Sequence, residues 1–309
     1  MGGALRRMSA DGDRAVRVHA HFAHDPALVG LLLARLTGLP YSFTGHARDL
    51  LQIPAESLAA RATAATALVT CCTANADYIA ATVPRTSLPP VFVIHYGVEL
   101  GRFVFADHRS DAPPVPEPRL VSVGRLVEKK GFADLLHALA RLADDGQEFR
   151  CRLYGEGPLL GELTALRDAL GLADRVELMG PASSDQIVAA LASADAFVLT
   201  PRVTADGDRD GIPNVLVEAM ACGLPVVTTS AGGITELVHD DVNGLVCAPG
   251  DVAGIAGALR RLLCDPRLRG RLATVARRTV EDGYDVDDAA RRLEGLLLER
   301  VPAGTGAVG

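Results

Sequence analysis

Short apolar, β-branched runs alternate along the chain with longer Ala- and Leu-rich segments of helical periodicity. In the N-terminal third these runs predict four strands, at Val16–Ala20, Tyr41–Thr44, Leu68–Thr70 and Val91–Ile94. Farther along they predict six more, at Leu120–Val123, Arg150–Tyr154, Val176–Met179, Ala196–Thr200, Val226–Thr228 and Leu245–Cys247. Strands that alternate with helices are typical of βα units and parallel sheets. The pattern therefore predicts an α/β fold with a short first domain and a complete, doubly wound second domain.

A proline-rich stretch separates the two groups of predicted strands. Residues 113–118 hold four prolines, which cannot continue a helix or a central strand. We expect a first domain at residues 1–105, a linker at 106–118 and a second domain at 119–283. A final helical pattern at 284–300 lies beyond the second domain, and we expect it to pack back toward the first.

The composition fits two packed domains and excludes several classes of protein. The 309 residues suffice for two domains of ordinary size, and 49% of them are hydrophobic. The net charge of −7 argues against a nucleic-acid-binding protein. The six cysteines form no C-x-x-C pair, so we expect reduced thiols and a cytoplasmic protein. No apolar run reaches the length of a membrane helix, and peripheral membrane contact is left open.

The first candidate site follows the first predicted strand of the second domain. The sequence VSVGRLVEKKG, at residues 121–131, places a glycine loop between that strand and a predicted helix. Helix N-termini bind anions through unpaired N–H groups, and Arg125 and Lys130 add two cations in the loop that leads into this helix. Lys129 and Lys130 are the only lysines of the chain. We expect Lys130 to face an anion, with a solvated loop charge as the alternative, and Lys129 to be solvated.

A second glycine loop follows the next predicted strand. In the sequence LYGEGPL, at residues 153–159, Gly155 and Gly157 would let the backbone approach a ligand closely. Pro158 would suit the first turn of a helix. A lone G-x-G is a weak signal, so a plain turn remains an equal alternative.

A third candidate site combines two carboxylates with a helix. The pattern predicts a helix from Pro213 to Gly223, with Asp210 in the loop at its mouth and Glu218 inside an apolar stretch. A carboxylate in such surroundings is either paired or bound to hydroxyl groups. We expect the two carboxylates to hold a polyhydroxylated ligand, with a structural ion pair of Glu218 as the alternative.

Together these segments carry a family resemblance. The runs GRLVEKKGF, GEGP, DGIPNVLVEAMACGLPVV and AGGITE stand in the order and at the spacing seen in family four of the retaining glycosyltransferases. The segments HAHFA at residues 19–23 and FTGHARD at residues 43–49 are similar to members that build exopolysaccharides and other surface glycans. The resemblance spans residues from about 16 to 300 and implies two facing Rossmann-like domains, the GT-B fold.

The resemblance implies a role for each matching residue. Arg125 and Lys130 would bind and stabilise the departing diphosphate, Glu218 would hold the ribose hydroxyls, and Asp210 would contact hydroxyls of the donor sugar. His46 would reach the transferred sugar from the first domain. Further donor contacts would come from Gly124, Gly155, Gly157, Met179, Gly211 and Ile212.

The implied activity is hexosyl transfer with retention from a nucleotide-sugar, UDP- or GDP-linked, to a glycan or lipid-linked acceptor. Preorganised cations at the departing oxygen would be the main catalytic device, so neither a metal nor another cofactor is expected. The sequence does not reveal the base, the sugar or the acceptor.

Two departures from the family pattern keep other hypotheses open. The family usually has Glu where this chain has Asp210, whose carboxylate is set back by one C–C bond, about 1.5 Å. The first domain also lacks about two βα units at its start, so we expect it to be incomplete. The alternatives are a donor-binding fragment or partner subunit with impaired catalysis, and a nucleotide-sugar epimerase or hydrolase of the same fold.

Several other polar residues allow more than one interpretation. His19, His21 and His24 could bind a metal, line an active site or be structural, and the absence of a nearby Cys or acidic ligand disfavours the metal. Asp206 and Asp208 form a D-x-D in a charge-rich loop, which we expect to be solvated rather than metal-binding.

Overall fold

The computed structural model describes residues 17–105 and 117–298. They fall into two compact units, one made of residues 17–95 and 287–298 and the other of residues 96–105 and 117–286. Each unit is described by itself below, as the first unit and the second unit. Both contain a parallel sheet with flanking helices, which confirms the predicted α/β class and two-sheet organisation.

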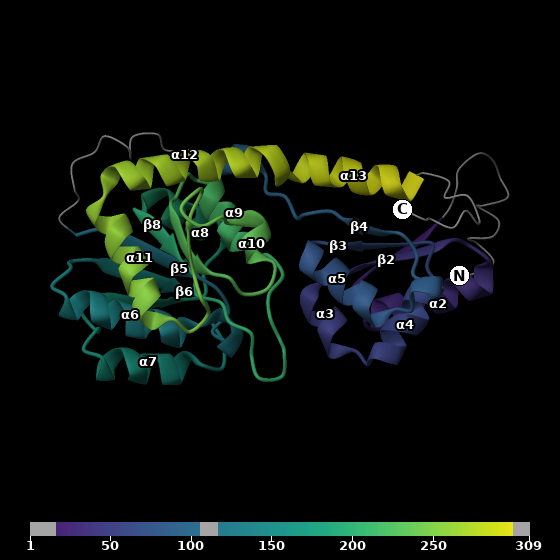
Figure 1. Cartoon of the computed structure of the whole chain (residues 1–309), viewed down its shortest axis with the longest axis horizontal. Coiled ribbons are helices and arrows are strands. Elements are labelled where there is room, and N and C mark those ends of the chain that lie inside the picture. The colour runs from purple at the N-terminus through teal and green to yellow at the C-terminus, as the bar shows by residue number, and fades with distance from the viewer. Residues whose placement is uncertain (1–16, 106–116, 299–309) are drawn as a thin grey trace. The chain divides into compact units, whose positions relative to one another are not determined.

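The described part of the first unit has four parallel strands in the order β1-β2-β3-β4 (Figure 1). They are β1 (Val18–His21), β2 (Tyr41–Gly45), β3 (Ala67–Thr70) and β4 (Val91–Val93). The connecting helices are α2 (Asp25–Thr37), α3 (Ala47–Gln52), α4 (Ala55–Thr63) and α5 (Thr73–Thr82), with a short 3₁₀ turn η1 (Arg85–Ser87) before β4. β2 and β3 are buried along their whole length, as is typical of strands in a parallel sheet that is covered on both faces.

Two clusters of buried residues sandwich this sheet. On one side Leu31, Phe43 and Leu68 belong to a core shared with α2, α4 and α5. On the other side Val69 packs with Leu296 of α13 (Val286–Leu298). Leu68 and Val69 face opposite ways because side chains alternate along a strand. The C-terminal helix is thereby part of the first unit.

The second unit has a six-stranded parallel sheet in the order β10-β9-β8-β5-β6-β7. The strands are β5 (Arg119–Val123), β6 (Arg150–Tyr154), β7 (Val176–Gly180), β8 (Ala196–Val198), β9 (Val226–Thr229) and β10 (Leu245–Cys247). From β5 the chain first builds outward through β6 and β7, then returns to the other side of β5 with β8. Strand order therefore reverses between β5 and β8, which in doubly wound sheets is where ligands bind, at the carboxyl ends of the strands.

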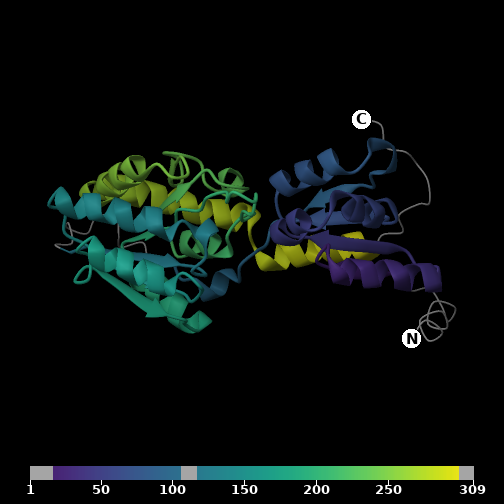
Figure 2. The ribbon, with the colours of Figure 1, turned by 90° about the horizontal axis from the view of Figure 1, so that it is seen from below.

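Helices cover both faces of this sheet (Figure 2). α6 (Phe132–Asp144), α7 (Leu160–Ala169) and α11 (Val252–Cys264) pack together on one face. The chain also forms α8 (Ser184–Ser193), α9 (Asn214–Ala221), α10 (Ile234–Leu237) and α12 (Pro266–Gly283), with α9 packed against α12. The 3₁₀ turns are η2 (Leu100–Arg102) and η4 (Glu128–Lys130). The apolar face of α6 is buried, including Leu135, Leu136, Leu139 and Leu142.

Most predicted strands lie within two residues of the observed ones at either end. The strand expected at Ala196–Thr200 ends at Val198, because the chain turns there into the loop that leads to α9. Pro213 is the N-cap of α9 rather than its first residue, and Pro158 lies before α7 rather than in its first turn. The linker expected at residues 106–118 lies largely outside the described residues. Among those described, no helix is both long and apolar enough to cross a membrane.

Candidate donor site at the switch point

The candidate site lies in two loops at the carboxyl ends of β5 and β8, the neighbouring strands where the order reverses. One loop runs from Gly124 to Gly131 into α6, and the other from Leu199 to Pro213 into α9. Arg202 N donates to Lys129 O at 2.9 Å, and Thr200 Oγ1 donates to Gly131 O at 2.7 Å. These two bonds join the loops at their bases.

Gly131 is fixed by this close approach. Its φ is +67°, a left-handed conformation that favours glycine, and a Cβ there would overlap the carbonyl oxygen of Thr200. The glycine therefore allows the N-terminus of α6 to lie directly against the second loop.

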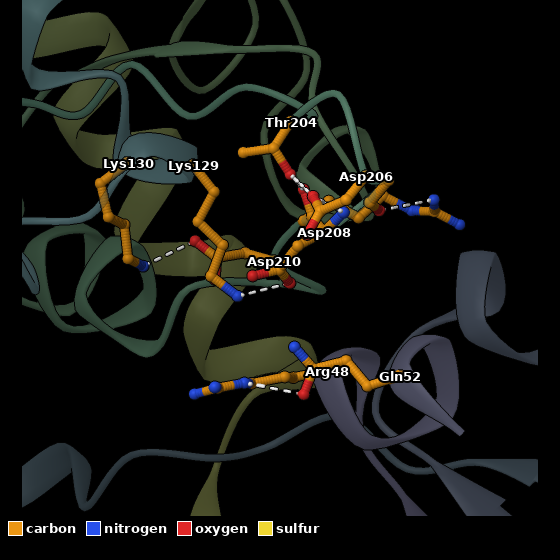
Figure 3. Close-up of polar contacts among 10 residues, drawn as sticks. Arg48, Gln52, Lys129, Lys130, Thr204, Asp206, Asp208 and Asp210 are labelled. Atoms are coloured by element: carbon orange, nitrogen blue, oxygen red, sulfur yellow. Dashed lines mark hydrogen bonds and ion pairs between the residues drawn. The ribbon is translucent and has the colours of Figure 1, made fainter. Parts of the chain in front are cut away.

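Both lysines point from the first loop to carboxylates of the second (Figure 3). Lys130 Nζ lies 2.6 Å from Asp210 Oδ2, and Lys129 Nζ lies 3.0 Å from Asp208 Oδ1 and 3.4 Å from Asp210 Oδ1. The side chains are 6% exposed for Lys129, 13% for Lys130, 16% for Asp210 and 22% for Asp208. Two cations and two anions thus form a largely desolvated network, which we call the Lys–Asp cluster.

The expectation that Lys129 is a solvated charge is wrong. Its side chain is buried because the second loop folds over it and supplies two carboxylates. The expectation that Asp206 and Asp208 share a solvated loop fails for Asp208, which pairs with Lys129. It holds for Asp206, an exposed residue whose carboxylate accepts from the Thr204 hydroxyl; that bond and the backbone bond from Asp208 hold its pKa below the usual range.

The glycines of the second motif serve the packing of two loops. Leu126 N donates to Glu156 O at 2.8 Å, and Gly124 N donates to Tyr154 O at 3.0 Å. A Cβ at Gly155 would overlap the carbonyl oxygen of Gly124, and one at Gly157 would meet the backbone of Leu126. These glycines therefore let the loop after β6 lie directly against the loop after β5, and their predicted approach to a ligand stays a prediction.

The carboxylate of Glu218 lies in the middle of α9 and is half-buried. Within the described residues it accepts no hydrogen bond and forms no ion pair, so the structural ion pair considered for it is not found there. Burial raises the pKa of Glu218, and the charge of Arg102 partly opposes this. A carboxylate that is partly desolvated and lacks a partner is available to accept ligand hydroxyls.

The other residues predicted to contact the donor lie in different environments. Gly211 O accepts from Gly233 N at 3.1 Å, which ties the loop before α9 to the turn before α10. Ile212 is partly buried against the core. Met179, at the end of β7, and Arg125, after β5, are exposed. The guanidinium of Arg125 forms no hydrogen bond or ion pair in the described part of the chain, so it is available to an anion.

In the first unit, His46 follows β2 and is the N-cap of α3. Burial lowers its pKa; Asp49 opposes this, while His21 and His24 lower the pKa further. His46 N donates to Asp49 Oδ1 at 3.0 Å. We therefore expect a largely neutral imidazole at neutral pH.

The three other candidate histidines do not form a metal site. His19 bonds Ser42 Oγ at 2.9 Å and Thr44 Oγ1 at 3.0 Å, and burial lowers its pKa to about 4, so it is a structural residue of β1. His21, the last residue of β1, and His24, the N-cap of α2, are both exposed. Across residues 17–105 and 117–298, no group of three or more His, Cys, Asp or Glu side chains has the geometry to hold a metal ion.

The family model described as glycosyl transferases group 1 matches residues 104–279, more than half of the chain. The chain belongs to this family. The matched residues include the glycine loops, the Lys–Asp cluster and Glu218.

Individual members of the family resemble the chain over part of their length. It is 37% identical over 211 residues to the putative colanic acid biosynthesis glycosyltransferase WcaL of Escherichia coli (strain K12), covering 67% of this chain and 50% of that protein. It is 38% identical over 180 residues to the amylovoran biosynthesis glycosyltransferase AmsK of Erwinia amylovora, covering 58% and 44% respectively. The chain thus spans about half the length of these relatives.

The fold also matches that of solved GT-B structures. Anabaena HepE in complex with UDP superposes with a TM-score of 0.79 at 20% identity, over 96% of this chain and 81% of that one. At this identity the match shows the fold, and it confirms the predicted pair of Rossmann-like domains.

The sequence motifs of this glycosyltransferase family did not reveal two members of the Lys–Asp cluster. Lys129 and Asp208 lie 79 positions apart and meet only because β5 and β8 are neighbours in the sheet. One signal was present in the sequence: both lysines of the chain are adjacent, and three aspartates stand close together between Ala205 and Gly211.

Proposed function

We propose that this chain transfers a hexosyl group from a nucleotide-sugar, UDP- or GDP-linked, to a glycan or lipid-linked acceptor during surface polysaccharide synthesis, with retention of configuration. The observation that carries the proposal is the Lys–Asp cluster at the switch point, where Lys130 is held beside Asp210 and the exposed Arg125 lies on the same loop as Lys130. Relatives named for colanic acid and amylovoran biosynthesis support the acceptor class. Structural neighbours solved with UDP and UDP-glucose support the donor class.

Arg125 and Lys130 would receive the donor diphosphate. As the glycosidic bond breaks, negative charge grows on the departing phosphate oxygen, and fixed cations that are partly shielded from water stabilise it strongly. Lys130 is 13% exposed and is oriented by Asp210, so little reorganisation is needed when the charge develops. These two cations can neutralise the diphosphate, so the proposal requires no divalent metal.

Asp210 would have two tasks. Its Oδ2 holds Lys130 at 2.6 Å, while its Oδ1 lies 3.4 Å from Lys129. An ionised carboxylate has about four acceptor positions, so Asp210 can hold the lysines and still accept a hydroxyl of the donor sugar. The shorter Asp side chain, where the family usually has Glu, would place that hydroxyl closer to Lys130.

Glu218 would accept the two ribose hydroxyls of the nucleotide. Its carboxylate lacks a protein partner, and hydroxyl donors would replace the hydration that burial removes. Gly124, Gly155, Gly157, Met179, Gly211 and Ile212 would complete the donor contacts. His46, neutral at pH 7, would hydrogen-bond the transferred sugar.

The test is release of nucleoside diphosphate from UDP-glucose, UDP-galactose, GDP-mannose and GDP-fucose, followed by proton NMR of the anomeric centre of the product. Retention of the donor's anomeric configuration is expected for one donor. Lys130→Met should lower turnover by about 10²–10³-fold, the usual cost of removing one preorganised group that stabilises a developing charge. Arg260→Met, at an exposed ion pair on α11, is the matched control and should retain activity.

The outcomes separate the competing functions. Release of diphosphate with water as the only acceptor would favour a hydrolase, and interconversion of nucleotide-sugars without release would favour an epimerase. Donor binding without any turnover would favour a donor-binding subunit.

A further inference from the structure

Phe22 occupies an unusual position at the end of β1. Its φ is +79°, in the left-handed region that a bulky side chain rarely adopts. The ring is also 46% exposed, so the strain is not offset by burial in a core. Strained residues of this kind persist only where neighbouring bonds enforce them, and they concentrate at ligand-binding positions.

The backbone around Phe22 is held from both sides. Phe22 N donates to Thr44 O at 2.8 Å, and the next peptide nitrogen, of Ala23, donates to the buried carboxylate of Asp49. Arg61 Nη1 donates to Ala23 O at 2.7 Å. Contacts from β2, α3 and α4 therefore fix a conformation that presents an aromatic ring to solvent.

Two imidazoles flank the exposed ring. The rings of Phe22 and His24 lie 5.5 Å apart with an interplanar angle of 5°, and those of Phe22 and His46 lie 4.6 Å apart at 49°. His24 Nδ1 accepts from Asp25 N at 2.8 Å, so a neutral His24 carries its proton on Nε2. An apolar ring face is thus bordered by groups that donate and accept hydrogen bonds.

This combination matches the surface of a sugar ring, which has a flat face of C–H groups and a rim of hydroxyls. Ligand sites generally pair an aromatic surface with a few oriented polar groups. A stacked nucleobase would come with a phosphate, but the cation that contacts this segment, Arg61, is bonded to Ala23 O. The net charge of −7 also disfavours a polynucleotide.

We propose that Phe22, flanked by His24 and His46, is a stacking platform for a hexose ring of the acceptor glycan. This rests on the proposed function, since it names the acceptor subsite of the same enzyme. Asp49 is a positioning residue of the platform. Its carboxylate accepts from both Ala23 N and His46 N, and it thereby fixes the backbone next to Phe22 relative to that of His46.

The experiment measures saturation transfer by NMR from the full chain to methyl α-glucoside, methyl α-galactoside and methyl α-mannoside, with calorimetric titration of UDP and GDP on the same samples. Four proteins are compared: wild type, Phe22→Leu, Phe22→Tyr and Phe92→Leu. Phe92 is 40% exposed on β4 of the same unit and is the matched control.

If the platform exists, saturation of the protein should be transferred to the ring C–H protons of at least one glycoside. Phe22→Leu should weaken this binding on the order of tenfold, because it keeps apolar bulk but removes the aromatic face. Phe22→Tyr and Phe92→Leu should retain it, and nucleotide affinity should be unchanged in all four proteins. Phe22→Gly should also lose sugar binding while its melting temperature stays level or rises, because glycine relieves the strain.

Three results would overturn the platform: no transfer to any glycoside, equal transfer in wild type and Phe22→Leu, or parallel loss of sugar and nucleotide binding in Phe22→Leu. A fall in melting temperature in Phe22→Gly would also count against it, because it would mean that the ring is structural. Failure of the proposed function would give a different result. Wild type would then bind a glycoside through Phe22, but it would neither bind UDP or GDP nor release a nucleoside diphosphate from a nucleotide-sugar.

Discussion

Lys129 provides the sharpest test of the Lys–Asp cluster, because the substitution Lys129→Met keeps most of the side-chain volume and removes only the charge. The Lys129 side chain is 6% exposed and its ammonium pairs with both Asp208 and Asp210, so its removal takes one cation away from two partly buried carboxylates. Removing one partner of a buried ion pair costs about 3–5 kcal/mol. Lys130 still pairs with Asp210, and both carboxylates retain some solvent, so we expect the lower end, about 3 kcal/mol.

The assay is thermal and urea unfolding of wild type, Lys129→Met, Asp208→Asn and the double variant. About 3 kcal/mol corresponds to a fall in Tm of roughly 6–12 °C for a domain of this size. Asp208→Asn should cost less, because Lys129 keeps Asp210, and the double variant should lose less than the sum of the two. Arg260→Met, which breaks an exposed pair with Asp145, should cost about 0–1 kcal/mol. A loss for Lys129→Met no larger than this control would refute the reasoning.

Three further predictions use other parts of the structure. Gly131→Ala should lower the free energy of unfolding in urea by about 3 kcal/mol, because its Cβ would meet the Thr200 carbonyl at positive φ. Gly146→Ala, at positive φ in open space, should lower it by about 1 kcal/mol, and equal losses in the two variants would contradict the close approach. Burial lowers the pKa of His19 to about 4, so the unfolded chain takes up the proton first and the stability from neutral His19, complete above pH 6.5, is lost as the pH falls toward 4. The melting temperature of wild type should therefore fall more steeply between pH 6.5 and pH 4 than that of His19→Asn, and equal slopes would oppose this. Ellman's reagent should label the exposed Cys264 quickly in the native protein, the half-buried Cys247 more slowly, and the four buried thiols only after unfolding. Rapid labelling of more than two thiols in the native protein would be inconsistent with the burial of those four.

The strands and the sheet type could be predicted from the sequence because both sheets are parallel and covered by helices. Buried strand residues such as Phe43 in β2 and Leu153 in β6 lie in short, largely apolar segments bounded by loop residues, which is a strong local signal for a strand. The ends of elements were less accurate. Thr200 extends the apolar run of β8 but turns away to bond Gly131, and that partner lies 69 positions distant in the sequence.

The site was predictable where motifs carry it and not where folding brings distant residues together. Lys130, Asp210 and Glu218 stand in recognisable segments. The sequence alone predicts a surface charge for Lys129, because its burial depends on the loop after β8 folding over it. Phe22 gave no signal at all, since nothing in the sequence HAHFA shows that its backbone is left-handed or that Asp49 enforces it.

The measurement that tests the central claim most directly is calorimetric titration of the purified chain with UDP, GDP and ADP, repeated on Lys130→Ala and Glu218→Ala. Arg260→Ala and Glu162→Ala, at exposed positions of the same unit, are the matched controls. The account predicts micromolar binding of one nucleotide, retained in both controls and weakened at least tenfold in both site variants. Unchanged affinity in Lys130→Ala and Glu218→Ala, or no binding by the folded wild-type chain, would contradict a donor site at the switch point.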